Sequence, residues 1–282
     1  MEENKGILVL LASPIGNRED ITLRALRILK EADLIACEDS RHTGPLMDYY
    51  GVSASLISYQ KFNEKKRTGE ILQAVRSGKK VVLMTDAGMP GISDPGMVVL
   101  KEAIKENVPF TVLPGPSAGV TCYVASGLGD GTYYFIGFLP RKGKDREAWL
   151  KKLDSLTTSA VIYEAPHRIR KTIEEFGKRW PERRLVLCRE WTKTFEERIS
   201  FLGKEAEDID LTERGEFVII LEEAVKNRDS SEGDELESSR DLLKSLIDQG
   251  YSTKEAINRA KTNSSLSRNE LYSLALNITK KK

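Results

Sequence analysis

The sequence predicts an α/β protein made of two successive α/β units and a small helical appendage at its C-terminal end. Three observations carry this prediction. Short apolar runs alternate with helical patterns through the first 115 residues. A second set of strand-like runs follows, with fewer helices between its members. Beyond residue 240, short amphipathic helices follow a polar, acidic stretch. A length of 282 residues suits two domains and an appendage.

The first domain is expected at residues 1–115, with a parallel or mostly parallel sheet. Apolar runs predict its strands at 7–12, 33–37, 55–59, 80–85 and 110–113. Apolar residues at helical spacing predict helices at 21–29, 64–77 and 98–106. Strict alternation of strand and helix is typical of parallel sheets.

The second domain is expected at residues 116–224, where a helix begins near Ser117. Its predicted strands are 133–138, 159–163, 184–189, 197–201 and 216–221, with helices at 144–153 and 168–176. The last strands follow one another with little helix between them. This spacing favours a mixed sheet with antiparallel pairs.

Residues 225–282 are expected to form an acidic linker followed by a helix-turn-helix-like appendage. The linker prediction covers residues 224–239, which are polar and acidic. Ser252 with Glu255, and Ser267 with Glu270, have the spacing of capping boxes before apolar residues at helical spacing. Residues 251–282 also carry an excess of Lys and Arg.

Composition narrows the functional classes. The formal net charge is +1, so only local charge clusters can indicate a partner. Three distant cysteines and two histidines argue against a zinc site and favour reduced thiols in the cytoplasm. The apolar run near the N-terminus is too short for a signal peptide or a membrane span. We expect a cytoplasmic protein without a metal or a membrane partner.

Two loops rich in glycine and proline mark the expected site. Residues 86–96 (DAGMPGISDPG) follow one strand, and residues 113–118 (LPGPSA) follow the next. Glycine lets a backbone approach a ligand closely, and proline fixes the shape of a loop. Because ligands of open α/β sheets bind at the carboxyl ends of strands, both loops are expected to border one site.

A set of motifs extends this pattern over residues 6–222. The motifs are 11–17 (LASPIGN), 38–43 (EDSRHT), 86–96, 114–118 (PGPSA), 137–140 (GFLP), 163–168 (YEAPHR), 189–193 (REWTK) and 215–217 (GEF). In order and spacing they resemble the tetrapyrrole-methylase superfamily of class III S-adenosylmethionine methyltransferases, and most of all its branch that acts on small-subunit ribosomal RNA. The resemblance implies a cofactor cleft between the two α/β domains, a homodimer, and methylation of a cytidine ribose 2′-hydroxyl in the decoding region of 16S rRNA or of the assembled small subunit.

Cofactor contacts are expected at the loop residues. Asp86 follows a strand and could accept hydrogen bonds from the ribose or ammonium of S-adenosyl-L-methionine, and the backbone of the next three residues could hold its methionine end. The resemblance implies the remaining contacts. The full expected set is Pro14, Asp86, Ala87, Gly88, Met89, Ser117, Ala118, Tyr163, Gly215 and Glu216.

A ribose hydroxyl is a poor nucleophile until its proton leaves, so a base is expected nearby. Acidic and histidine residues at predicted strand ends are the candidates, and the residues alone do not choose among them. The expected catalytic residues are Asp39, His42, Glu164 and Glu190, with His167 as a further candidate. For His42 a structural hydrogen bond is as good an interpretation as a base.

Clusters of Lys and Arg near these motifs favour contact with an RNA backbone. The expected RNA-binding residues are Arg41, Arg141, Lys142, Lys144, Arg146 and Arg168. Two alternatives stay open. One is a tetrapyrrole C-methyltransferase of the same fold, although the N-terminal turn ASPIG differs from the Gly-x-Gly-Pro-Gly turn of that group. The other is a non-catalytic RNA-binding assembly factor, which would leave the two loops and the strand-end carboxylates unexplained.

Overall fold

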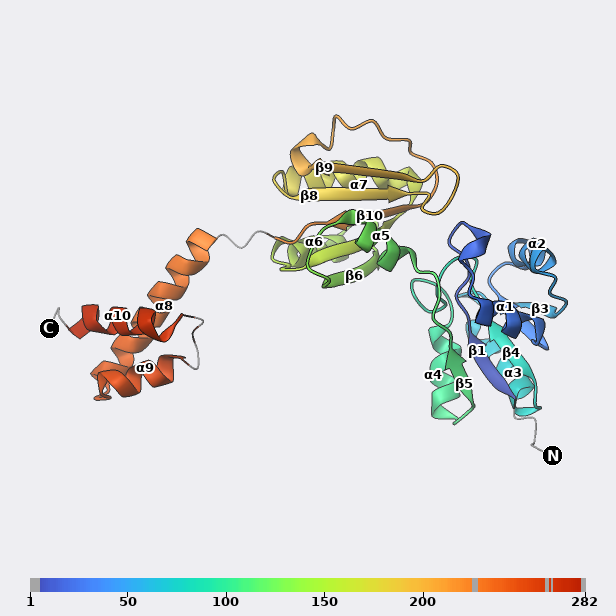
Figure 1. The fold of residues 1–282 in the computed structure, drawn as a ribbon, viewed down its shortest axis with the longest axis horizontal. Coiled ribbons are helices and arrows are strands. Elements are labelled where there is room, and N and C mark those ends of the chain that lie inside the picture. Colours follow the sequence, from blue (N-terminus) through green and yellow to red (C-terminus); the bar gives the residue numbers. More distant parts are fainter. Residues whose placement is uncertain (1–5, 225–227, 262–263, 265, 280–282) are drawn as a thin grey trace. The chain divides into compact units, whose positions relative to one another are not determined.

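The computed structural model describes residues 6–224, 228–261, 264 and 266–279, with the backbone alone for 228–237 and 279. The chain divides into two compact units between residues 224 and 225 (Figure 1). The first unit holds two sheets, and the second holds helices. The boundary expected at residue 115 stays a prediction. No helix in the described residues is long and apolar enough to span a membrane.

Five parallel strands form the first sheet, in the order β3-β2-β4-β1-β5. They are β1 (Ile7–Leu10), β2 (Leu34–Cys37), β3 (Ser55–Ser58), β4 (Lys80–Leu83) and β5 (Phe110–Val112). Along β1, Leu8 and Leu10 pack into one core, while Val9 packs into the core on the opposite face. Burial on both faces explains the near-continuous apolar runs, and the predicted parallel sheet is confirmed.

Helices cover both faces of this sheet. They are α1 (Leu23–Lys30), α2 (Ser40–Tyr50), α3 (Glu64–Arg76) and α4 (Met97–Lys105), with a short 3-10 turn, η1 (Arg18–Asp20), before α1. Helix α2 was not expected from the sequence, because Gly44 and Pro45 discourage a helix. Asp39 caps this helix by accepting a hydrogen bond from the Arg41 amide, and Met47 anchors it in the core.

The second sheet is mixed, as predicted, in the order β6-β7-β10-β8-β9. Its strands are β6 (Tyr133–Phe138), β7 (Ser159–Glu164), β8 (Arg184–Arg189), β9 (Glu197–Leu202) and β10 (Phe217–Leu221). Only β6 and β7 pair in parallel. Helix α5 (Ala118–Ser126) covers one face, while α6 (Lys144–Asp154) and α7 (Pro166–Arg179) cover the other. A 3-10 turn, η2 (Gly203–Glu205), follows β9.

The second unit consists of α8 (Arg228–Asp248), α9 (Thr253–Lys261) and α10 (Arg268–Thr279), packed around Leu243, Ile257 and Leu271. The linker prediction for residues 224–239 is therefore wrong from residue 228 on, because an acidic, serine-rich segment here continues into the helix that holds Leu243. Residues 225–227 of that prediction lie outside the described residues. The two capping boxes are confirmed: each serine amide donates to the glutamate three residues later.

Candidate active site

Backbone pairing joins the loops that follow β1 and β4. The Ser13 amide donates to the Gly88 carbonyl (2.9 Å), and the Gly88 amide donates to the Ser13 carbonyl (3.0 Å). The buried Ser13 hydroxyl donates to the Thr85 carbonyl (2.5 Å). Gly88 has a φ of +72°, a conformation that an L side chain rarely adopts. These bonds fix the start of residues 86–96, which we call the glycine–proline loop.

The rest of the glycine–proline loop is braced from two sides. The Gly96 amide donates to Glu64 Oε1 (3.0 Å) on α3, and Lys61 Nζ donates to the Ser93 carbonyl (3.1 Å). On the other side the loop reaches the second sheet, where a Cβ on Gly137 would lie 2.8 Å from Ser93 Oγ. The loop is therefore held by α3 and Lys61 on one side and contacts the second sheet on the other.

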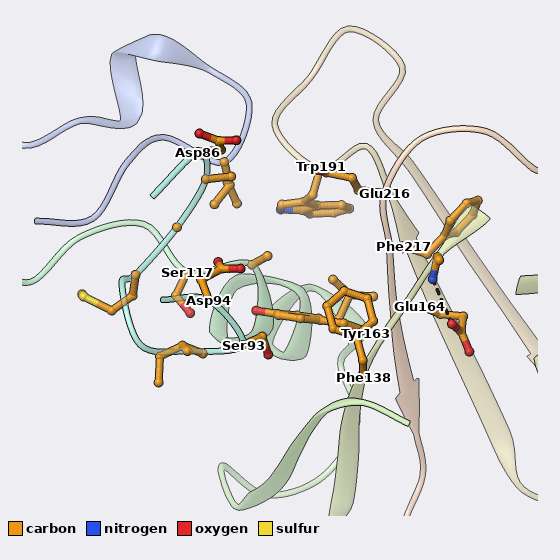
Figure 2. A pocket seen from close by; sticks show the side chains of 18 of the residues that line it. Asp86, Ser93, Asp94, Ser117, Phe138, Tyr163, Glu164, Trp191, Glu216 and Phe217 are labelled. Carbon is orange, nitrogen blue, oxygen red and sulfur yellow. Dashed lines mark hydrogen bonds between the residues drawn. The ribbon is translucent and has the colours of Figure 1, made fainter. Parts of the chain in front are cut away.

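A cavity of about 360 Å³ lies between the glycine–proline loop and the second sheet (Figure 2). We call it the central pocket. Its size is that of a small-ligand site. It is lined by Ile15, Glu38, Asp86, Ala87, Gly88, Met89, Ile92, Ser93, Asp94, Ser117, Ala118, Phe138, Tyr163, Glu164, Ala165, Pro166, Cys188, Trp191, Glu216, Phe217 and Val218.

Carboxylates give the central pocket a negative charge. Glu38, Asp86 and Asp94 line it and are half-buried, and none of its described lining residues is Lys, Arg or His. The exposed Glu216 also lines it, and its carboxylate pairs with Lys193 (2.9 Å) at the rim. Burial raises the pKa of Asp94, and the nearby charges of Asp86 and Glu216 add to this effect although Lys61 opposes it. Burial and the charges of Asp94 and Asp86 likewise raise the pKa of Glu38. The pocket is therefore suited to a cation.

Aromatic rings form the apolar part of the central pocket. Trp191 and Tyr163 face it from opposite sides, and Phe138 packs edge-on against Tyr163 (Figure 2). The Tyr163 hydroxyl accepts a hydrogen bond from the Gly119 amide (3.0 Å) in the first turn of α5. Tyr163 thus holds the start of α5, and with it Ser117 and Ala118, against the pocket.

The structure brings most of the expected cofactor residues to one place. Eight of the ten line the central pocket, in agreement with the expectation that both loops border one site. Pro14 and Gly215 do not line it. Pro14 is buried beside the Ser13–Gly88 pairing, and Gly215 packs against the Glu190 side chain.

Three expected catalytic residues lie outside the central pocket. His42 is exposed in the first turn of α2. The Asp39 carboxylate binds the Arg41 guanidinium (2.7 Å), which with the Arg41 amide lowers the pKa of Asp39 to about 2. Burial alone would raise the pKa of Glu190, but the Glu216 amide (2.9 Å) and the Lys193 ammonium (3.0 Å) outweigh it and lower the pKa. Carboxylates held in their charged form in this way are weak bases.

Glu164 lines the pocket, but its carboxylate is 0% exposed. It pairs with the Arg168 guanidinium (3.0 Å) and accepts hydrogen bonds from the Thr172 hydroxyl (2.7 Å) and the Ala165 amide (2.9 Å). On β7, Ala160 and Ile162 pack toward α6 and α7, and Glu164 follows them with the same two-residue period. The structure thus gives Glu164 a structural role.

We expect Glu164→Gln to lower the free energy of unfolding by about 3 kcal/mol, because it leaves the largely buried Arg168 without its partner. Chemical denaturation measures this loss. Glu182→Gln, which changes an exposed carboxylate, is the matched control and is expected to shift it by less than about 0.5 kcal/mol. If the Glu164→Gln protein is as stable as the wild type but does not transfer methyl groups, Glu164 has a catalytic role and the structural assignment is wrong.

The expected RNA-binding residues fall into two groups. Arg141, Lys142, Arg146 and Arg168 line a second cavity, between α6 and α7. Arg41 is exposed next to Asp39, and Lys144 is exposed at the start of α6. Arg146 is buried and bonded to Glu175 and to the Pro140 carbonyl, so we remove it from the proposed RNA contacts.

Sequence reasoning missed several pocket residues. Glu38, Asp94, Phe138 and Trp191 all lie inside motifs that were noticed, but none was singled out. For Asp94 a signal existed, since it stands in the same glycine–proline loop as Asp86. Trp191 had none, because its position depends on the left-handed backbone of Glu190 and Thr192 on either side.

Comparisons with known proteins agree with this architecture. Residues 8–207 match the family model of the tetrapyrrole (corrin/porphyrin) methylases. The chain is similar to ribosomal RNA small subunit methyltransferase I of Halalkalibacterium halodurans, with 37% identity covering 96% of this chain and 95% of that protein. The same-named protein of Bacillus subtilis is 34% identical, covering 96% and 94%.

Among solved structures, uroporphyrin-III C-methyltransferase of Thermus thermophilus in complex with S-adenosyl homocysteine shares the fold. The TM-score is 0.55 at 19% identity, covering 78% of this chain and 99% of that one. The matched residues take in the first sheet and every strand of the second sheet except β10, and the two relatives match almost end to end. The chain therefore belongs to the tetrapyrrole methylase family and, within it, to the ribosomal RNA small subunit methyltransferases I.

Proposed function

We propose that this protein transfers a methyl group from S-adenosyl-L-methionine to the 2′-hydroxyl of a cytidine ribose in the decoding region of 16S rRNA. The names of the relatives supply the substrate class. The observation that carries the cofactor is the central pocket, whose lining holds Glu38, Asp86 and Asp94 without an ion pair among the described residues, beside Glu216, which pairs with Lys193 (2.9 Å). That charge pattern fits a small cationic ligand.

The residues of the pocket fit S-adenosyl-L-methionine, which carries a sulfonium and an ammonium group. Asp86 would hold the cationic or hydroxyl-bearing part, and the backbone of residues 87–89 approaches closely because Gly88 has no side chain. Ser117 and Ala118 at the start of α5, with Tyr163 on β7, form the opposite wall. The sulfonium supplies the methyl group. A molecule with the same scaffold is bound in the T. thermophilus structure.

Asp94 is the base that fits the geometry best. It lines the central pocket, lies between Asp86 and Tyr163 in Figure 2, and has no hydrogen bond or ion pair among the described residues. The neighbouring Ser93 touches β6 at Gly137, next to the exposed Phe138. A hydroxyl that enters past Phe138 would give its proton to the Asp94 carboxylate. The raised pKa of Asp94 makes it a stronger base than an exposed aspartate.

The protein would act as a homodimer in the cytoplasm, on rRNA or on the assembled small subunit. Support for a dimer comes from the edge of the first sheet, where β5 exposes Phe110 and Val112, and from α5, which exposes Val120 and Val124. If these side chains form one contiguous apolar surface, burial in a dimer would remove it from water. Arg41 and Lys144, both exposed, stay proposed RNA contacts.

The test has two steps. Calorimetry with S-adenosyl-L-methionine measures cofactor binding, and transfer of a labelled methyl group is then followed with free 16S rRNA, with small subunits that lack the modification, and with a reduced tetrapyrrole. Methylated RNA or subunits support the proposal. A methylated tetrapyrrole with unmodified RNA contradicts it, and cofactor binding without any transfer to RNA would do the same.

A further inference from the structure

A second cavity, of about 550 Å³, lies between α6 and α7. We call it the α6–α7 groove. Its walls come from the turn before α6 and from the facing sides of both helices, and its described lining is rich in Arg and Lys. The groove is lined mainly by cations and the central pocket by carboxylates, so the groove suits an anionic ligand and the pocket a cationic one.

Two arginines of the α6–α7 groove are tied into the protein and build its walls. Arg146 donates to Glu175 (2.9 Å) and to the Pro140 carbonyl (2.9 Å). Arg168 pairs with the buried Glu164 and donates to the Leu139 carbonyl (3.0 Å). Both hold the chain segment that leaves β6 against α7. Their charge is already compensated, so they shape the groove without being its free cations.

Three further cations have no such partner. Arg141, Lys142 and Lys171 line the α6–α7 groove, are exposed, and form no ion pair among the described residues. The two lining carboxylates are already engaged, Glu147 by Arg179 (3.0 Å) and Glu175 by Arg146. The groove therefore carries uncompensated positive charge that is open to solvent.

The groove and the central pocket are lined by residues that are close together in the sequence. Phe138 lines the pocket, and Arg141, three residues later, lines the groove, at most about 11 Å away along the backbone. The turn after β7 repeats this link, with Pro166 in the pocket and His167 in the groove. At about 3.4 Å of rise per nucleotide, a few nucleotides of one strand cover this distance.

We propose that the α6–α7 groove binds phosphates of the RNA strand next to the nucleotide whose ribose enters the central pocket. Arg141, Lys142 and Lys171 contact the phosphates, and Phe138 marks the point where the strand turns into the pocket. The inference rests on the proposed function for the identity of the strand. Phosphate contacts fix register without reading sequence, so this groove positions the ribose and the pocket performs the chemistry.

The test measures binding of a fluorescent single-stranded RNA of the decoding-region sequence, at several salt concentrations, to the full-length protein. Arg141→Ala, Lys142→Ala and Lys171→Ala are each expected to weaken binding about tenfold. Each should also reduce the slope of log affinity against log salt by about 0.7, the value for one contact to a single strand. Calorimetry should show unchanged affinity for S-adenosyl-L-methionine.

Lys178→Ala is the matched control, because Lys178 lies on the same helix but pairs with Glu207 (3.1 Å) outside the groove. Melting curves show that all variants are folded. If the three groove variants have the same RNA affinity and the same salt slope as the Lys178→Ala protein, the proposed role of the groove is wrong, and the proposed function is not affected. Groove-dependent RNA binding without methyl transfer by the wild type upholds the groove and overturns the proposed function. A wild type that does not bind this RNA overturns the groove, whereas the proposed function is overturned only if methyl transfer to small subunits is absent as well.

Discussion

Replacing Asp94 with asparagine is expected to lower kcat for methyl transfer at least a hundredfold, the usual lower bound for a general base. The substitution keeps the size of the side chain and removes its ability to take a proton. Because a base acts in the transition state, the Kd for S-adenosyl-L-methionine should change much less than kcat. Single-turnover methylation of small subunits, together with calorimetry, separates the two quantities.

The pH profile gives a second readout of Asp94. Burial, with the charges of Asp86 and Glu216, raises the pKa of Asp94. The wild-type rate should therefore fall with decreasing pH already above the ordinary aspartate range, as Asp94 becomes protonated, and Asp94→Asn should lack this acid limb. Glu38→Gln, at the other half-buried pocket carboxylate, is the comparison. A loss of less than about tenfold in Asp94→Asn, with the acid limb retained, would contradict the assignment.

Asp86→Ala is expected to weaken S-adenosyl-L-methionine binding ten- to a hundredfold, because it removes a charge-assisted interaction of about 1.5–3 kcal/mol. Asp86 Oδ1 also accepts a hydrogen bond from the Asp39 amide (3.2 Å). Asp86→Asn retains an oxygen for this amide and removes only the charge. It is therefore expected to show most of the loss in affinity with little loss of stability.

Calorimetry on both Asp86 variants measures the effect, and thermal melting reports the fold. Asp208→Asn changes an exposed carboxylate outside the central pocket and is the control. Wild-type affinity in a folded Asp86→Asn protein would show that the negative charge of the pocket does not hold the cofactor. If Asp86→Ala weakens S-adenosyl-L-methionine binding and Asp86→Asn does not, Asp86 acts by positioning the loop and not by its charge.

The positions of the strands could be predicted from the sequence, and so could the parallel and the mixed character of the two sheets. Strands that are buried on both faces appear in the sequence as uninterrupted apolar runs. Leu8 and Val9 face opposite cores, so the run has no polar interruption. Helix α2 and the first part of α8 were missed because their sequences have low helix propensity. Pro45 lies inside α2, and α8 begins in an acidic, serine-rich segment, so local propensity disagrees with the observed helix in both places. Tertiary packing of Met47 and Leu243 decides these cases.

The site could be located from the sequence, but not the direction of each side chain. Glu164 and Tyr163 are neighbours at the same strand end, yet the ring lines the pocket and the carboxylate is buried against Thr172 on the other face. The two-residue period of β7 could have separated them. The position of Asp94 depends on a left-handed Ser93 (φ +68°) and on the contact with Gly137, which no local pattern shows.

The most direct test of the central claim is to identify the methylated nucleoside. Small subunits that lack the modification are incubated with the protein and S-adenosyl-L-methionine carrying a labelled methyl group, and the 16S rRNA is digested and analysed by mass spectrometry. The account predicts that the label is recovered as 2′-O-methylcytidine from one fragment of the decoding region. Label on a base, on another ribose, or on no RNA fragment would contradict it.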